Sequence, residues 1–135
     1  MDNLNSTLAS WQPRVLSILR IVLGVLLLQH ALMKLFSFPG PFMRPVVTGE
    51  LIWFAGVLEL IGGVLLIIGL FTRWTAFILA GLMAFAYFMG HAPRGFYPII
   101  NGGNLAILYC FVAFYLFFSG PGPWSVDAQR SGSNA

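Results

Sequence analysis

The chain has 135 residues, of which 59% are hydrophobic, 16% are aromatic and only 8% are charged. Because about a quarter of the residues of soluble globular proteins are charged, this composition excludes a soluble globule and predicts an integral membrane protein in contact with the lipid bilayer. The formal net charge is +3, but the seven basic residues are scattered among apolar runs and form no patch, so we expect no nucleic-acid partner.

Four apolar segments predict an all-α, four-transmembrane-helix bundle with short loops. The expected spans cover about residues 15–36, 49–71, 74–90 and 101–119, and a membrane helix needs about 20 residues. Stretches rich in proline, glycine or polar residues separate them. The chain is therefore read as a single membrane domain, with residues 120–135 as a partly disordered tail.

The first span carries several polar side chains in an apolar background. At 100° per residue, Arg20, His30 and Lys34 fall on one face of the helix, and Gln29 points the other way. Lys34 lies near the end of the span, where its long side chain is able to reach the interface. We therefore expect a basic face on the first helix, directed at a neighbouring helix.

A single carboxylate, Glu59, stands near the middle of the second span. An ionisable group at this depth costs roughly 3 kcal/mol, so it is expected to face the bundle interior and to have a partner. The residues three and four positions to either side are Ala55, Gly56, Gly62 and Gly63. Their small size predicts that another helix packs closely against the face from which Glu59 emerges.

Arg20 is the favoured partner of Glu59, because its long guanidinium reaches toward the middle of the membrane. His30 ranks second, since it is shorter but better suited to relay a proton. Two interpretations of the resulting polar site between the first two helices stay open. It is either a structural ion pair that fixes the helices, or a group that handles protons or contacts a polar ligand.

The sequence predicts no cofactor site of its own. Cys110 is the only cysteine, so the chain forms neither an internal disulfide nor a C-x-x-C redox pair. No His, Cys, Asp or Glu residues share metal-ligand spacing on one helix, so no metal site is expected. We identify no catalytic residue, and the chain is not expected to act as an enzyme without partner proteins.

The distribution of basic residues bears on orientation. With four crossings, both termini and the second loop lie on one side of the membrane. That side holds four basic residues and the other three: Arg14, Arg20, Arg73 and Arg130 against Lys34, Arg44 and Arg94. Because basic residues favour the cytoplasmic side, we expect both termini in the cytoplasm, with the protein in a bacterial inner membrane.

Several motifs, taken in order, resemble the DoxX family of small four-helix membrane proteins. They are Leu19-Arg20-Ile21 with Gly24 and Lys34, the run from Gly56 through Glu59 to Gly63, Gly69-Leu-Phe-Thr-Arg73, Asn101-Gly-Gly103 and Gly120-Pro-Gly-Pro-Trp-Ser-Val-Asp127. The resemblance covers roughly residues 16–127. Family members often carry an acid directly after the Asn-Gly-Gly turn, where this chain has Asn104, so any role of that acid is lost or altered here.

The resemblance implies a redox association, because the family takes its name from subunits of quinone-linked thiosulfate oxidation and some members are linked to oxidative-stress assemblies. The first hypothesis is an accessory membrane subunit of such an assembly, whose oxidoreductase partners supply the electron-carrying cofactor. A quinone ligand and a homo-oligomer are both compatible with it. The alternative is a cofactor-free protein that transports a small molecule or lipid, or scaffolds other membrane proteins.

Overall fold

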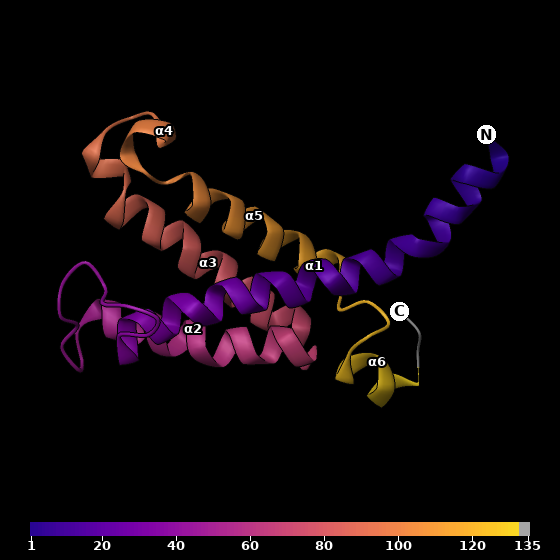
Figure 1. Cartoon of the computed structure of the whole chain (residues 1–135), viewed down its shortest axis with the longest axis horizontal. Coiled ribbons are helices and arrows are strands. Elements are labelled where there is room, and N and C mark those ends of the chain that lie inside the picture. The colour runs from indigo at the N-terminus through magenta and orange to yellow at the C-terminus, as the bar shows by residue number, and fades with distance from the viewer. Residues whose placement is uncertain (133–135) are drawn as a thin grey trace.

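The computed structural model describes residues 1–132 and is helical, with no β-strand in that part of the chain (Figure 1). Three helices are long and apolar enough to cross a membrane, and α5 is a shorter apolar helix. The elements are α1 (Asp2–Phe36), α2 (Leu51–Ile68), α3 (Thr72–Gly90), a short 3₁₀ helix (Ala92–Arg94), α4 (Pro98–Asn101), α5 (Asn104–Ser119) and α6 (Val126–Ser131).

The observed helices differ from the expected spans mainly at their ends. α1 continues from the expected span 15–36 back to Asp2. α2 is shorter than the expected 49–71, because Gly69 takes a left-handed conformation (φ 73°) and ends the helix. A separate helical turn, α4 (Pro98–Asn101), precedes the expected span 101–119, and the long helix begins only at Asn104. The tail at 120–135, expected to be partly disordered, contains helix α6 at Val126–Ser131; residues 133–135 lie outside the described residues.

Helices α1 and α2 form a closely packed antiparallel pair. A Cβ atom added to Gly24 would lie 2.8 Å from the carbonyl oxygen of Gly63, and one added to Gly63 would lie 3.0 Å from the carbonyl oxygen of Gly24. Gly56 also faces α1, whereas Gly62 faces Leu79 of α3. These glycines let the helix backbones approach more closely than larger side chains would permit.

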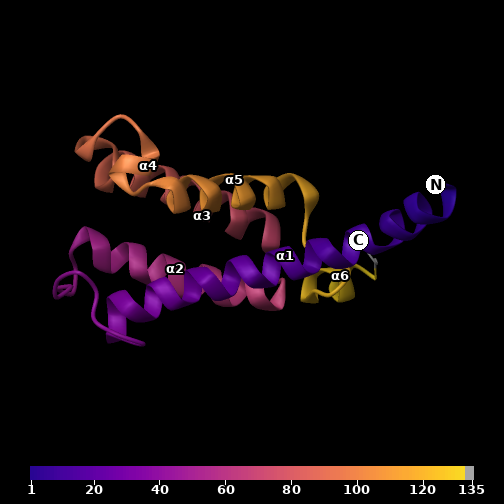
Figure 2. The ribbon, with the colours of Figure 1, turned by 45° about the horizontal axis from the view of Figure 1, so that its top comes forward.

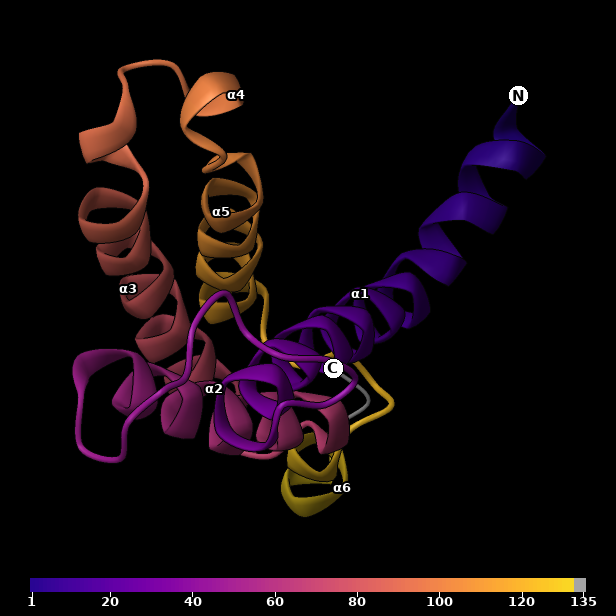
Figure 3. The ribbon, with the colours of Figure 1, turned by 60° about the vertical axis from the view of Figure 1, so that its left-hand side comes forward.

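Helices α3 and α5 form a second antiparallel pair. Figure 2 shows the two pairs as separate layers, and in Figure 3 they run in clearly different directions and come together near the turn between α2 and α3. Buried apolar side chains from both pairs form one core, which includes Leu23, Leu27, Leu66, Ala76, Leu79, Met83, Tyr109, Ala113 and Leu116.

The segment after α5 contacts the turn between α2 and α3, where the two helix pairs meet. The Asp127 carboxylate accepts hydrogen bonds from the backbone N–H groups of Phe71 and Thr72, at 2.9 and 2.8 Å. It thus caps the N-terminus of α3, where backbone donors lack helical partners and negative charge is favourable. The Asp127 N–H donates to the Gly69 carbonyl at 2.9 Å. The C-terminal segment is therefore part of the packed structure.

Candidate functional site

A buried ion pair joins α1 to α2. Lys34 Nζ lies 2.7 Å from Glu59 Oε1, and the side chains are only 14% and 3% exposed. Glu59 is eight residues from Leu51, which places it roughly 12 Å from the start of α2 and near its middle. The structure thus places a lysine beside the acid that the sequence singled out.

Gly56 gives Lys34 access to Glu59. It lies one helical turn before the acid on α2, and a Cβ at this position would come within 3.3 Å of the Lys34 Cβ and 3.2 Å of the Leu35 side chain. An added Cβ would therefore require the Leu35 and Lys34 side chains to shift by a few tenths of an ångström. The small residue beside the carboxylate therefore lets the lysine side chain reach it.

One oxygen of the Glu59 carboxylate is left without a partner. Oε1 accepts from Lys34, but Oε2 is buried and has no hydrogen-bond partner among residues 1–132. A buried polar atom without a hydrogen bond costs on the order of 1–3 kcal/mol. The site therefore has an unused polar group that a proton, a water molecule or a ligand atom would satisfy.

His30 lies one turn before Lys34 on the same face of α1. Its Nδ1 is 2.8 Å from the Leu26 carbonyl oxygen, and because a carbonyl only accepts, Nδ1 carries the proton. The imidazole contacts the Tyr109 ring edge-on, with 5.6 Å between the ring centroids and an angle of 88° between the planes. Since Tyr109 belongs to α5 and is buried, the polar cluster connects the two helix pairs.

The pairing of Arg20 with Glu59 predicted from the sequence is wrong. Arg20 is fully buried and donates to three backbone carbonyls: to Leu66 from Nε at 2.8 Å, to Trp124 from Nη2 at 2.6 Å, and to Pro121 from Nη1. With Gly24 facing Gly63 in an antiparallel pair, Arg20 is level with Leu66, and Glu59 lies roughly 10 Å back along α2. Arg20 therefore holds the C-terminal segment against α1 and α2.

Local sequence patterns do not indicate two of the residues described above, Tyr109 beside His30 and Asp127 at the N-terminus of α3. Nothing in the sequence marked Tyr109, because only the packing of α5 brings it to His30. Asp127 was visible as an acid, but its role depends on a contact 55 residues away along the chain. Lys34 was on the predicted basic face but was assigned to the interface. No cluster of three or more His, Cys, Asp or Glu that could hold a metal ion occurs among residues 1–132.

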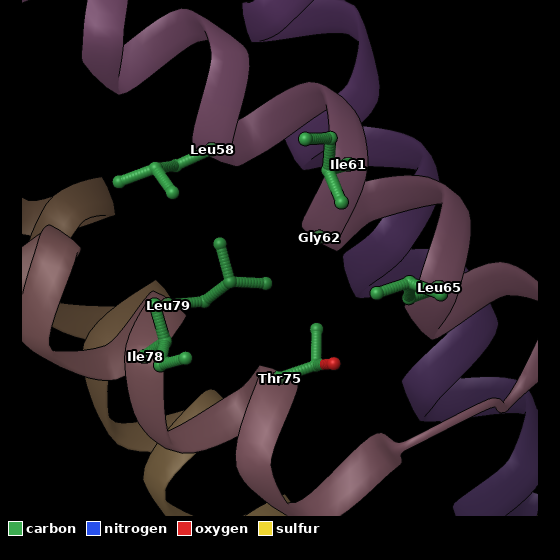
Figure 4. A pocket seen from close by; sticks show the side chains of 7 residues that line it. All are labelled: Leu58, Ile61, Gly62, Leu65, Thr75, Ile78 and Leu79. Carbon is green, nitrogen blue, oxygen red and sulfur yellow. The ribbon is translucent and has the colours of Figure 1, made fainter.

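A separate apolar groove lies between α2 and α3, with a volume of about 100 Å³ (Figure 4). The side chains of α2 and α3 face one another across it in Figure 4, and Thr75 brings the hydroxyl seen there. Its lining residues are Leu58, Ile61, Gly62, Leu65, Thr75, Ile78 and Leu79. Glu59 is not among them, so this groove and the polar cluster are distinct features.

Apolar helices of membrane-spanning length around a buried ion pair define a small integral membrane protein. The sequence model of the DoxX family matches residues 15–92, more than half of the chain, and the chain belongs to this family. The family resemblance seen in the sequence is thereby confirmed.

Two proteins of Haemophilus influenzae are similar to this chain. One is 42% identical over 127 residues, which is 90% of this chain and 95% of that protein. The other is 33% identical over 91 residues, which is 67% of this chain and 59% of that protein. Both are named only "uncharacterized protein", so they support the family and assign no activity. No solved structure matches the chain significantly.

Proposed function

We propose that this protein is an accessory membrane subunit of a redox assembly, quinone-linked or active in oxidative stress, in which the Lys34, Glu59, His30 and Tyr109 cluster contacts a quinone head group. The observation that carries the proposal is the buried Glu59 Oε2, which has no hydrogen-bond partner among residues 1–132 and lies beside Lys34, with His30 one turn before this lysine on α1. The redox association implied by the family resemblance agrees with it.

The chemistry of these side chains fits a quinone head group in both redox forms: the carbonyl oxygens of the quinone accept hydrogen bonds from Lys34, and a hydroxyl of the reduced quinol would donate to Glu59 Oε2. Lys34 has three N–H donors and uses one on Glu59, and the other two make no hydrogen bond within residues 1–132. Lys34 and half-buried His30 retain some exposure, so both are accessible from outside the helix pair. The Tyr109 hydroxyl makes no hydrogen bond within residues 1–132 and offers a further donor.

The same cluster is suited to exchanging protons. Because Nδ1 of His30 is held by Leu26, its Nε2 accepts a hydrogen bond when the ring is neutral and donates one when the ring is protonated. Glu59 has a free carboxylate oxygen that takes up or gives up a proton beside Lys34. A bound quinone would supply the capacity to carry two electrons with two protons; partner subunits would supply the electron-transfer cofactor.

The proposal includes a topology of four spans with α5 as the fourth, in a bacterial inner membrane with both termini cytoplasmic. In support, α1 and α3 are each followed by an antiparallel partner, so the N-terminal part of α1, the α2–α3 turn and α6 lie toward one end of the molecule (Figure 1). Arg14, Arg20, Arg73 and Arg130 belong to that end, against Lys34, Arg44 and Arg94 at the other, and this excess of one basic residue favours the cytoplasmic side.

The test is quinone retention. The protein is purified with its native lipids, extracted, and assayed for quinones by mass spectrometry, together with Glu59→Gln and His30→Leu variants. Glu50→Gln is the matched control, because Glu50 is the other glutamate of the chain and pairs with Arg44 at the surface. We expect quinone to accompany the wild type and the control, and to be strongly reduced in both cluster variants at equal protein yield.

The main alternative is a cofactor-free protein that transports or shelters a small molecule or lipid, or a membrane scaffold. The apolar groove between α2 and α3 favours a lipid role, because an acyl chain has the same apolar character as its lining. The alternative would be supported if the wild-type preparation contained neither quinone nor oxidoreductase partners but retained a specific lipid.

A further inference from the structure

α1 is much longer than a membrane crossing requires. Its 35 residues span about 52 Å, whereas the apolar core of a bilayer is about 30 Å thick. The N-terminal part of the helix projects away from the other helices (Figures 1 and 3). Residues 2–14 precede the apolar part of the helix and are all exposed, so this extension lies outside the lipid core.

A continuous row of large apolar side chains runs along one exposed face of α1. Each is 43% exposed or more, and they are separated by alternating steps of four and three residues: Leu4, Leu8, Trp11, Val15, Ile18, Val22 and Val25. An average spacing of 3.5 residues is the pattern with which two helices pack in a coiled coil. We call these seven residues the outer seam.

The outer seam is not used by the fold of the single chain. The face of α1 that packs against α2 and the C-terminal segment carries the buried residues Ser17, Arg20, Leu23, Gly24, Leu27 and Ala31. At 100° per residue, the centres of the two faces point in nearly opposite directions. Pro13, the only proline inside α1, is also on the face opposite the seam, where its ring does not obstruct a partner helix.

Gln29 extends the outer seam by one further step of four residues. It is exposed within the span and its amide makes no hydrogen bond within residues 1–132. An amide that faces lipid has no water to bond to, and amides in membrane helices bond across helix interfaces. One polar residue in an apolar seam also sets the register and the number of helices in a coiled coil. Gln29 is therefore a second, independent indication of a partner helix.

We propose that the partner is a second copy of this chain, bound through the outer seam as a parallel, two-fold symmetric dimer. Copies inserted in the same orientation have parallel α1 helices, so each seam residue meets its own counterpart and the two Gln29 amides bond to each other. The seam residues within the lipid core already have an apolar environment. Leu4, Leu8 and Trp11 lie outside the core, where their burial against the apolar side chains of a partner helix removes them from water and is favourable.

The composition of the seam suits the packing of this helix against its own copy. β-branched side chains occupy both alternating positions, Val15 and Val22 at one and Ile18 and Val25 at the other, and they pack as knobs into the facing helix. The seam positions hold no charged residue, so no like charges oppose each other across the symmetry axis. This dimer is independent of the proposed function, because the seam and the Glu59 cluster occupy different faces of α1.

Cysteine cross-linking in native membranes tests the dimer. In a Cys110→Ala background, single cysteines replace Leu8, Trp11 or Val15 on the seam, or Ser6 or Ser10 on the opposite side of the same exposed turns. We expect an oxidant to link the seam variants into dimers at least several-fold more than the two serine-site controls. Equal linking at all five positions, or at none, would overturn the proposal.

Charge insertion provides a second test that does not depend on oxidation. Leu8→Glu with Trp11→Glu is expected to halve the apparent mass of the protein in detergent, whereas Ser6→Glu with Ser10→Glu adds the same charge and leaves the dimer intact. Because all four side chains are exposed, helicity should be unchanged in both. Gln29→Leu should lower the dimer fraction and Gln29→Asn should retain it.

Two further results would overturn the proposal by showing another occupant. One is selective labelling of the cysteine at position 8 or 11 by a photoreactive lipid, which would place the extension on the membrane surface. The other is a specific cross-link from the same positions to a different protein, with a single copy of this chain in the linked product.

Discussion

The Lys34 ammonium lies 2.7 Å from the Glu59 carboxylate, and the two groups come from neighbouring antiparallel helices. Removing both charges from water is costly, and the pair offsets that cost only while both partners are present. Gly56 on α2 leaves room for the approach, and the second carboxylate oxygen has no hydrogen-bond partner in the described part of the chain. The stability of the α1–α2 pair and the proposed ligand contact therefore depend on the same acid.

Replacing Glu59 should lower the stability of the protein by an amount that depends on the residue introduced. Glu59→Ala leaves the buried Lys34 charge without a partner and should cost about 3–5 kcal/mol. Glu59→Gln keeps an acceptor for Lys34 and should cost less. The measurements are accumulation in the membrane and thermal unfolding in detergent, and we expect the order wild type, Gln, Ala in both.

Double replacements identify the partner of Glu59. Lys34→Met with Glu59→Met removes both charges and should recover accumulation relative to Glu59→Ala, because no buried charge is left unpaired. Arg20→Met with Glu59→Met leaves Lys34 unpaired and also removes three hydrogen bonds, so it should be worse than either single variant. Recovery in the Arg20 combination alone would contradict the observed pairing.

Arg20→Lys should loosen the C-terminal segment. The guanidinium reaches three carbonyls in three directions, which a single ammonium on a flexible stem does not reproduce. Hydrogen bonds to charged groups contribute about 1.5–3 kcal/mol each, so a loss of at least about 3 kcal/mol is expected. Limited proteolysis should show faster cleavage within residues 120–131. Arg94→Lys serves as the control, because Arg94 is exposed and its side chain makes no hydrogen bond to any residue from 1 to 132.

Gly24→Ala should separate α1 from α2. The added Cβ would meet the backbone of α2 at Gly63 and Ile67, at 2.8–3.0 Å, and backbone has little room to move. Overpacking of this kind costs about 1–3 kcal/mol. At Gly81, within α3, an added Cβ meets nothing within 4 Å; Gly81→Ala should stabilise by up to about 1 kcal/mol through helix propensity. Equal unfolding temperatures for the two variants would speak against the close contact.

The loop before α2 should respond to acid. Hydrogen bonds from Arg44 hold the pKa of the Glu50 carboxyl below its ordinary value. A lowered folded-state pKa means that the Arg44–Glu50 pair contributes above the ordinary pKa of a glutamate, and that this contribution is lost as the pH falls through the folded-state pKa. Arg44→Gln should return the titration of Glu50 toward its ordinary range. Carboxyl titration by NMR in micelles checks both statements.

The amino-acid sequence is sufficient to predict an integral membrane protein and to single out Glu59 as a buried acid that needs a basic partner. Its apolar segments are long enough to predict membrane helices, because a helix that crosses lipid needs about 20 apolar residues regardless of its neighbours. Helical spacing alone also placed Arg20, His30 and Lys34 on one face of α1, and glycines around Glu59. These inferences depend only on the spacing of residues along a helix, which can be read directly from the sequence.

The packing of the helices shows that Lys34, and not Arg20, pairs with Glu59. Three basic groups shared the face of α1, and the choice among them depended on the register in which α1 and α2 pack, which the contact between Gly24 and Gly63 reveals. Arg20 then lies beside carbonyls of the C-terminal segment, about a hundred residues away along the chain, while Lys34 reaches back to Glu59. Tyr109 joins the cluster through the packing of α5. Contacts between distant segments depend on how whole helices pack, and local sequence patterns do not specify that packing.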